Sequence, residues 1–262
     1  MRALLKLIRC EFWKIKRKKL FHIAFLTTFI IPVFYSMIIK DANLDNLMSV
    51  VQEENGFLVL IPLSIILAAS LFFEEQDHDT LKNLLCVPVT RGRLSLAKLF
   101  VVLVFDIAYE LAGFFVSLLL ALLSGIPLSG IGRELLLTTA CGALLWAASM
   151  PCLLLVIWCN RSYIISVIIA FAYTMLSYIL HISDAAIRVP LGLNIPTLLP
   201  VPVIFRWLYQ FHSLEDAGPV ITTFYESFSP YFVPTPTVFA ILMGEALLCI
   251  MIMIKIYERQ KI

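Results

Sequence analysis

Charged residues are scarce in this sequence. Only 15% of its 262 residues are Asp, Glu, Lys or Arg, whereas 61% are hydrophobic, and the mean hydropathy is +0.93. A soluble globular domain is about a quarter charged and about half apolar. The chain therefore has too little polar surface to cover a water-soluble fold, and its apolar surface needs lipid as a solvent. The net charge of +2 identifies no partner by itself, and we expect no nucleic acid to bind.

The sequence also lacks the motifs of common catalytic and metal sites. Its six cysteines contain no Cys-x-x-Cys pair, and no two of its four histidines have ligand spacing on a helix. A zinc site is therefore not expected. The chain has no Gly-x-Ser-x-Gly elbow, and it has no Gly-Lys dipeptide, which the usual phosphate-binding loop requires. We predict a non-catalytic chain that holds no metal and no cofactor of its own.

Six continuous hydrophobic runs are each long enough, or nearly so, to cross a membrane. A hydrocarbon core of about 30 Å needs about 20 apolar residues in a helix. The runs are unbroken and do not alternate with a period of two, which favours helices over barrel strands. The sequence predicts an all-α membrane protein that forms one domain over residues 1–262. The predicted spans are Leu20–Ile39, Phe57–Phe73, Leu99–Leu123, Leu135–Trp158, Tyr163–His181 and Thr237–Ile256.

The positions of lysine and arginine predict the orientation, because cytoplasmic segments carry an excess of them. With the N-terminus inside, all but four of the 20 basic residues are cytoplasmic, and the exceptions are Lys40, Arg133, Arg188 and Arg206. We therefore predict a multi-pass protein of the cell membrane with both termini in the cytoplasm.

Residues 1–19 precede the first span and have the pattern of an amphipathic helix. An apolar stripe contains Leu4, Leu5, Ile8, Phe12 and Ile15, and lysines and arginines fill most of the other positions. Such a helix lies flat on the inner leaflet, with its cations toward anionic headgroups. A simpler interpretation is a topology signal with no further role.

Two outer segments differ in character. The first, Lys40–Gly56, is acidic and polar and is predicted to be a loop. The second, residues 182–236, contains eight prolines but is too apolar for a solvated loop. Prolines prevent a continuous crossing helix, so we predict short helices that re-enter or lie on the outer leaflet. Two additional spans are the alternative.

The cytoplasmic segment of residues 74–98 joins the second and third predicted spans. Its helical core is Thr80–Val87, Pro88 ends this helix, and Arg91 and Lys98 follow. Leu81, Leu84 and Leu85 share one face of the core. A short amphipathic helix held in the cytoplasm can dock into a groove on another protein, or it can be a turn packed against the chain's own spans.

This segment resembles the cytoplasmic loop of type-2 ABC exporter permeases. In that family an acidic residue precedes a Gly-Thr-Leu helix, a Pro-Val-Ser-Arg turn and a Lys at the start of the third span. The chain has Glu75, Asp79-Thr80-Leu81, Leu84-Leu85, Pro88-Val89-Thr90-Arg91 and Lys98. Asp79 stands where Gly is usual, and Thr90 where Ser is usual. The size and the long outer segment resemble the permeases of bacitracin and lantibiotic self-protection exporters.

The resemblance implies a coupling helix that sits on a separate ABC ATPase. Two copies of that ATPase would carry ATP and Mg, and a second permease subunit, identical or related, would complete the translocation path in the membrane lipid. The substrate would be hydrophobic or amphipathic, for example a peptide antibiotic. The residues implied to contact the ATPase are Glu75, Thr80, Leu81, Leu84, Leu85, Pro88 and Arg91.

Three carboxylates fall inside predicted spans. Asp106 and Glu110 are four residues apart on the third span, so they share a face, and Glu245 lies near the middle of the sixth. A charge at mid-bilayer costs about 2.5–3.5 kcal/mol on insertion scales. These acids are either structural, being protonated or bonded to Tyr, Ser or Thr, or they line a substrate path. A proton-coupled secondary transporter that uses all three is one alternative function, and an intramembrane enzyme is another.

Overall fold

The computed structural model describes residues 2–38, 44–77, 90–159, 163–192, 194–212 and 219–259. Every regular element within these residues is helical. Six helices are long and apolar enough to cross a membrane, which confirms the predicted all-α membrane fold. These candidate spans are Phe21–Ile38, Leu44–Phe73, Arg91–Leu123, Ile131–Cys159, Tyr163–His181 and Thr235–Glu258.

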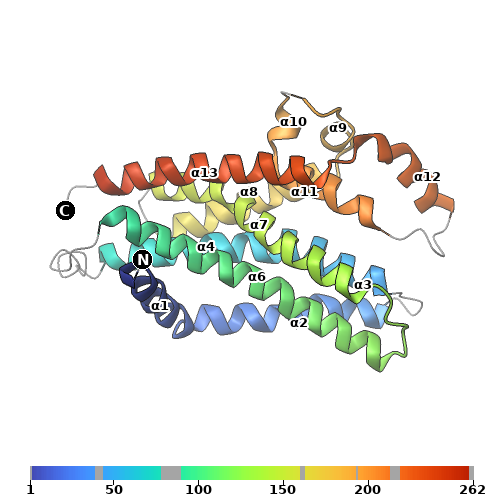
Figure 1. Cartoon of the computed structure of the whole chain (residues 1–262), viewed down its shortest axis with the longest axis horizontal. Helices are drawn as coiled ribbons and strands as arrows, with labels where there is room; N and C mark the ends of the chain where they lie inside the picture. The colour runs from blue at the N-terminus through green and yellow to red at the C-terminus, as the bar shows by residue number, and fades with distance from the viewer. Residues whose placement is uncertain are drawn as a thin grey trace.

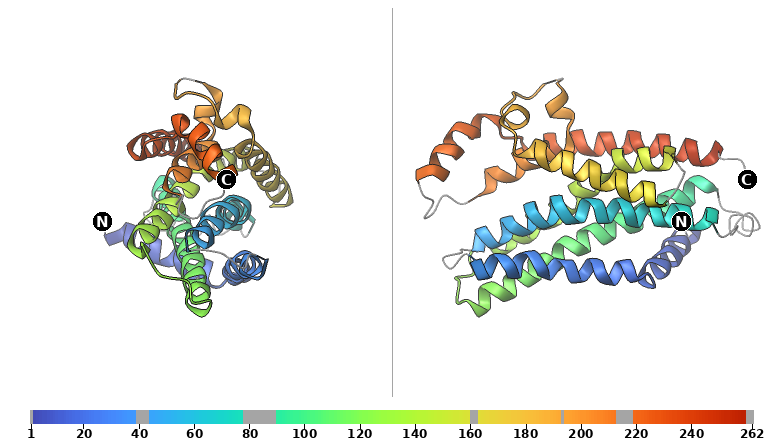
Figure 2. Two further views of the ribbon diagram at one scale, coloured as in Figure 1. Left: turned by 90° about the vertical axis from the view of Figure 1, so that its right-hand side faces the viewer. Right: turned by 180° about the vertical axis from the view of Figure 1, so that it is seen from behind.

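The long helices form an elongated bundle (Figure 1). Helix α7 (Ile131–Cys159) is central, since it packs against α4 (Ile61–Asp77), α6 (Arg91–Leu123) and α13 (Thr235–Arg259). Helix α1 (Arg2–Lys16) and the last turns of α13 lie at one end, which we call the terminal end. Helices α3 (Leu44–Val50) and α12 (Pro219–Phe228) lie at the opposite end (Figures 1 and 2).

Helix α1 packs against α6 with part of its predicted apolar stripe. Ile15 is buried and Ile8 is half-buried, but Leu5 is 62% exposed and Phe12 is 38% exposed. Glu11 is also buried, and Lys14 donates to it at 2.6 Å. The stripe is therefore divided between the bundle and the outer surface, and attachment of α1 to a leaflet stays a prediction.

The second span begins at Leu44, so the prediction of a polar loop over Lys40–Gly56 is wrong from that residue on. Helix α3 leads into a π-helix, η1 (Val51–Leu60), which continues as α4. The polar side chains are tolerated because they are bonded inside the bundle. The Gln52 amide donates to Thr138 at 3.0 Å, and Asn55 accepts from Tyr109 at 2.9 Å. A π-helix of this length is rare, and such segments are frequent at functional sites.

Beside two single turns of 3-10 helix, Tyr209–Phe211 and Ser229–Tyr231, the described residues of segment 182–236 form four short α-helices, each too short to span a bilayer. They are α9 (Asp184–Ile187), α10 (Ile195–Leu198), α11 (Pro200–Leu208) and α12. This agrees with the predicted broken helices and disfavours two further spans. Helix α11 is buried along its whole length between α7, α8 (Tyr163–His181) and α13. It belongs to the core, and entry of the segment into the membrane stays a prediction.

Candidate functional site

The predicted ATPase-coupling segment lies mostly outside the described residues. This applies to Thr80, Leu81, Leu84, Leu85 and Pro88, while the backbone of Glu75 is in the last turns of α4. Their role in binding an ATPase stays a prediction. The structure does show where this segment leaves α4 and where it enters α6, and both points lie at the terminal end (Figure 1).

Helix α6 begins at Arg91 rather than at Leu99, and its first turns contact α13. The Arg91 guanidinium donates to the carbonyl oxygen of Tyr257 at 3.3 Å. Gly92 allows this approach, because a Cβ atom there would lie 3.2 Å from Glu258 Oε1. The entry of the coupling segment into α6 is therefore fixed to the end of α13.

Lys98 is fully buried at the same junction. Its ammonium donates to the Leu71 carbonyl oxygen at 2.5 Å and lies 5.1 Å from the ring centroid of Phe72 and 5.9 Å from that of Tyr257. A buried cation is costly unless it is bonded, and aromatic faces stabilise it further. Lys98 thus joins the ends of α4, α6 and α13.

Asp106 and Glu110 lie one turn apart on α6, as predicted, and both are fully buried. The Ser64 hydroxyl donates to Asp106 Oδ2 at 2.7 Å. Asp106 Oδ1 and both carboxyl oxygens of Glu110 have no hydrogen-bond partner among the described residues. Buried polar atoms without partners are rare in native proteins, so this pair, with three such oxygens among the described residues, is a candidate functional site.

Two glycines make room for Glu110. A Cβ atom at Gly56 of η1 would lie 3.0 Å from Glu110 Oε1, and one at Gly142 of α7 would lie 3.3 Å from Glu110 Cγ. The acid is therefore enclosed by η1, α6 and α7. The neighbouring Tyr109 hydroxyl, which bonds Asn55, also lies 3.0 Å from Thr27 Oγ1 of α2 (Lys19–Ile38).

Glu245 is not joined to this pair. It is half-buried on α13, the last span. No hydrogen bond connects Glu245 with Asp106 or Glu110 within the residues that the structure describes. The structure therefore brings two of the three predicted carboxylates together and places the third elsewhere.

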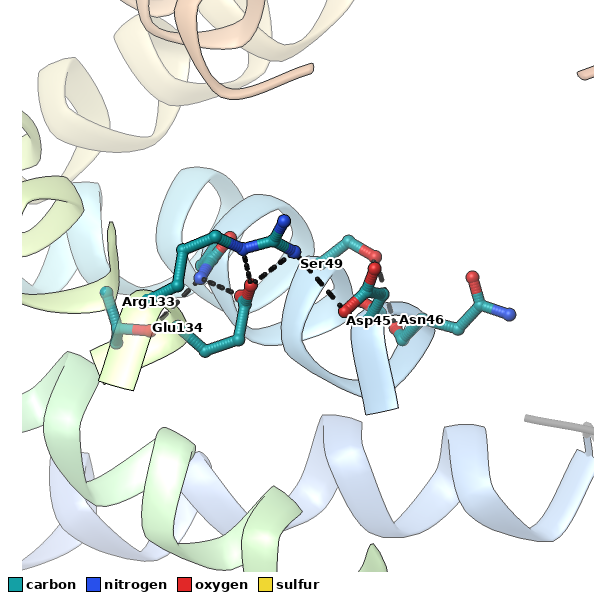
Figure 3. A network of polar contacts seen from close by, with 7 residues as sticks. Asp45, Asn46, Ser49, Arg133 and Glu134 are labelled. Atoms are coloured by element: carbon teal, nitrogen blue, oxygen red, sulfur yellow. Dashed lines mark hydrogen bonds and ion pairs between the residues drawn. The ribbon is translucent and has the colours of Figure 1, made fainter. Parts of the chain in front are cut away.

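The opposite end holds a polar network that the sequence analysis missed (Figure 3). The Arg133 guanidinium lies 2.9 Å from Glu134 and 3.5 Å from Asp45, so it joins the start of α7 to α3. The Gln52 amide lies 3.5 Å from the other oxygen of Glu134. Arg133 was predicted only as one of a few outer cations, and no local motif marks its partners.

His212 follows α11 and lies against this network. Its Nε2 atom is 3.3 Å from Glu53 Oε1, and the ring stacks on Tyr209 at 4.6 Å between centroids. A small pocket of about 10 Å³, room for about one water molecule, is lined in part by the polar side chains of His212, Gln52 and Glu134. Burial lowers the pKa of His212, although a backbone hydrogen bond at Leu208 and the nearby Asp45 oppose this shift.

The model of a family described as ABC-2 family transporter protein matches residues 7–177. This range includes the coupling segment, Asp106 and Glu110, and it stops before the segment 182–236 and α13. No curated protein matches the chain.

Proposed function

The chain belongs to the ABC-2 transporter family, and on this premise we propose that it is the permease subunit of an ATP-driven exporter. The family makes it a multi-pass membrane component of ABC transport that associates with ABC ATPases. We further propose two ATPase copies that carry ATP and Mg, and a second permease subunit, identical or related. The exported substrate is hydrophobic or amphipathic, and a peptide antibiotic is our candidate.

The observation that carries this proposal is the junction around Lys98. The coupling segment leaves α4 just after the Leu71 and Phe72 contacts of Lys98, and it returns at Arg91 beside Tyr257. ATP binding would close the ATPase dimer and move residues 74–98 as a lever. Because three spans meet at Lys98, this movement would reach α4, α6 and α13 together.

The proposed orientation has the terminal end in the cytoplasm. Exposed basic side chains of the N-terminal region are concentrated there, and they are Lys6, Arg9, Lys16, Arg17 and Lys19. This distribution follows the positive-inside rule, and it places the coupling segment on the side where ATP is available.

Co-purification with candidate ATPases tests the proposal. We expect one ATPase to co-purify with the full chain and to be lost in Leu84→Asp, since a carboxylate cannot be buried in an apolar groove without a large cost. Leu123→Asp is the matched control, because Leu123 ends α6 at the opposite end and is 76% exposed. An ATPase retained equally by both variants would contradict the coupling role.

A proton-coupled secondary transporter is the second candidate, and the unpartnered oxygens of Asp106 and Glu110 favour it. Export from proteoliposomes separates the two. The ABC proposal requires export to stop when ATP is depleted, whereas export that persists without ATP and collapses with the proton gradient would establish the alternative. An activity of the purified chain alone as a hydrolase or transferase would instead point to an intramembrane enzyme.

A further inference from the structure

An apolar pocket of about 320 Å³ opens on the side of the bundle. It lies between α1, α6, α7 and α13, and its wall includes Ile8, Leu96, Phe100, Leu103, Trp146 and Ile250. The Trp146 indole N–H donates to the Leu99 carbonyl oxygen at 3.1 Å, so it offers no donor to the interior. An apolar cavity does not retain water, and its occupant must therefore be apolar.

The pocket opens at the surface of α6 and is nearer the terminal end. Leu96 and Phe100 at its mouth are 43% and 46% exposed. These residues follow the start of α6 at Arg91 by only one to three turns. In a chain that crosses a membrane, this mouth faces acyl chains of one leaflet rather than water.

Two arginines lie close to pocket-lining residues along α6 and α1. Arg93 precedes Leu96 by three residues and Phe100 by seven, so it continues the same face of α6. It is exposed and forms no ion pair with the described carboxylates. On α1, the exposed Arg9 directly follows Ile8 of the pocket wall. An apolar pocket with arginines nearby is complementary to a molecule that has an apolar chain and an anionic headgroup.

We propose that this pocket binds one acyl chain of an anionic phospholipid from the cytoplasmic leaflet, with the headgroup phosphate at Arg93 and Arg9. A pocket of about 320 Å³ suits a narrow flexible chain better than a protein helix, whose diameter with side chains is about 10–12 Å. Basic side chains near a membrane surface attract anionic lipids. The leaflet assignment rests on the orientation proposed above, while the site itself does not depend on the ATPase.

Fluorescence quenching in lipid bilayers tests this site. The protein used is the full chain with the substitutions Trp13→Phe and Trp158→Phe. Those two tryptophans are 53% and 71% exposed, so bulk lipid would quench their fluorescence whether or not the pocket is occupied. Trp207 is 1% exposed and stays as a constant background. The probes are phosphatidylglycerol and phosphatidylcholine with brominated acyl chains, whose bromine atoms quench Trp146 on contact. We expect saturable quenching at a several-fold lower mole fraction of phosphatidylglycerol.

Three variants locate the interaction. Arg93→Gln should remove the preference for phosphatidylglycerol, and Leu103→Phe should reduce quenching by both lipids because it fills the pocket. Lys255→Gln is the charge-matched control, since Lys255 is exposed at the same end but is turned about 140° around α13 from Ile250.

Equal quenching by the two lipids in the parent chain would overturn the anionic site, and unchanged quenching in Leu103→Phe would overturn the pocket. The parent comparison decides the headgroup preference even if Arg93→Gln does not fold. A chain that still binds its ATPase but shows no lipid preference would refute this inference alone.

Discussion

The ammonium of Lys98 lies 5.9 Å from the ring centroid of Tyr257, so a cation near the start of α6 is covered by an aromatic ring near the end of α13. These residues are far apart in the sequence, and the family model that matches residues 7–177 does not extend to α13. The last span is thereby tied to the place where the proposed lever enters the membrane domain.

Replacing this ring should affect stability and coupling together. A cation–π contact contributes about 0.5–2 kcal/mol, so Tyr257→Leu should lower the thermal unfolding temperature and reduce ATP-driven export. Tyr257→Phe retains the ring and should remain close to the parent protein in both measurements. If Leu and Phe behave alike, the ring of Tyr257 is not part of the coupling path.

The substitution Glu110→Gln distinguishes a structural role of this buried acid from a role in proton coupling. Glutamine has nearly the same shape and cannot carry a proton or a charge. If the acid is structural, ATP-driven export should be unchanged and stability should be equal or higher, because both carboxyl oxygens lack partners among the described residues. Loss of export in a folded Glu110→Gln protein would instead support proton coupling through this residue.

At Gly142, even the addition of a single methyl group should destabilise the protein. A Cβ atom at this position would lie 2.9 Å from the Ile107 Cα atom, which belongs to the backbone of α6 and cannot rotate away. Gly142→Ala should therefore separate α6 from α7 and lower the free energy of unfolding by about 1–3 kcal/mol.

Gly244→Ala is the control for that substitution. Gly244 lies within α13, and no atom comes within 4 Å of a Cβ atom built there. Alanine should stabilise this helix by about 0.5–1 kcal/mol relative to glycine. Denaturant unfolding of the two variants in the same detergent measures the difference, and a loss of stability of the same size in both would show that close packing at Gly142 is not the cause.

The region around His212 should become less stable as the pH falls below about 6.5. Burial lowers its pKa below the usual value of 6.5, so the folded state binds fewer protons than the unfolded state just below that pH. Stability is then fully present above about pH 6.5 and falls as the pH drops toward the lower, folded pKa. Glu53, Asp45 and Arg133 are ionisable groups that lie near the ring.

Hydrogen exchange of residues 199–212, corrected for the intrinsic effect of pH, measures this change. His212→Gln cannot be protonated and should show a flatter pH dependence than the parent chain. His22→Gln, a substitution at an exposed histidine of α2, should change nothing. A steeper acid response in His212→Gln would reverse the sign and refute the role of burial.

The sequence was sufficient for the all-helical class and the six spans, because long apolar runs have one physical solution in a bilayer. The predicted fifth span has the same bounds as α8. The placement of Asp106 and Glu110 on one face of the third span could also be predicted from the sequence, since spacing on a helix determines which residues share a face. The family was also recognisable from the residues of segment 74–98, and the match to residues 7–177 confirms it.

The polar parts were harder to predict, because their burial depends on partners distant in the sequence. Gln52 and Asn55 have the composition of a loop, and only Thr138 and Tyr109 on other helices make them part of a span. Arg206 likewise has the appearance of an interfacial cation. It is fully buried, and its guanidinium donates to the Tyr231 carbonyl oxygen at 2.8 Å. Such pairings leave no periodic signal in the chain.

The π-helix η1 has a mechanical consequence for the whole bundle. Its hydrogen bonds reach one residue further than those of the α-helices on either side. Rewinding it to α-geometry would rotate α3 relative to α4, and Asp45, which Arg133 holds at 3.5 Å, would swing away from its guanidinium. Torsion within this one span would thus open the Asp45–Arg133 contact at the opposite end, while the half of the span beside Lys98 stays in place.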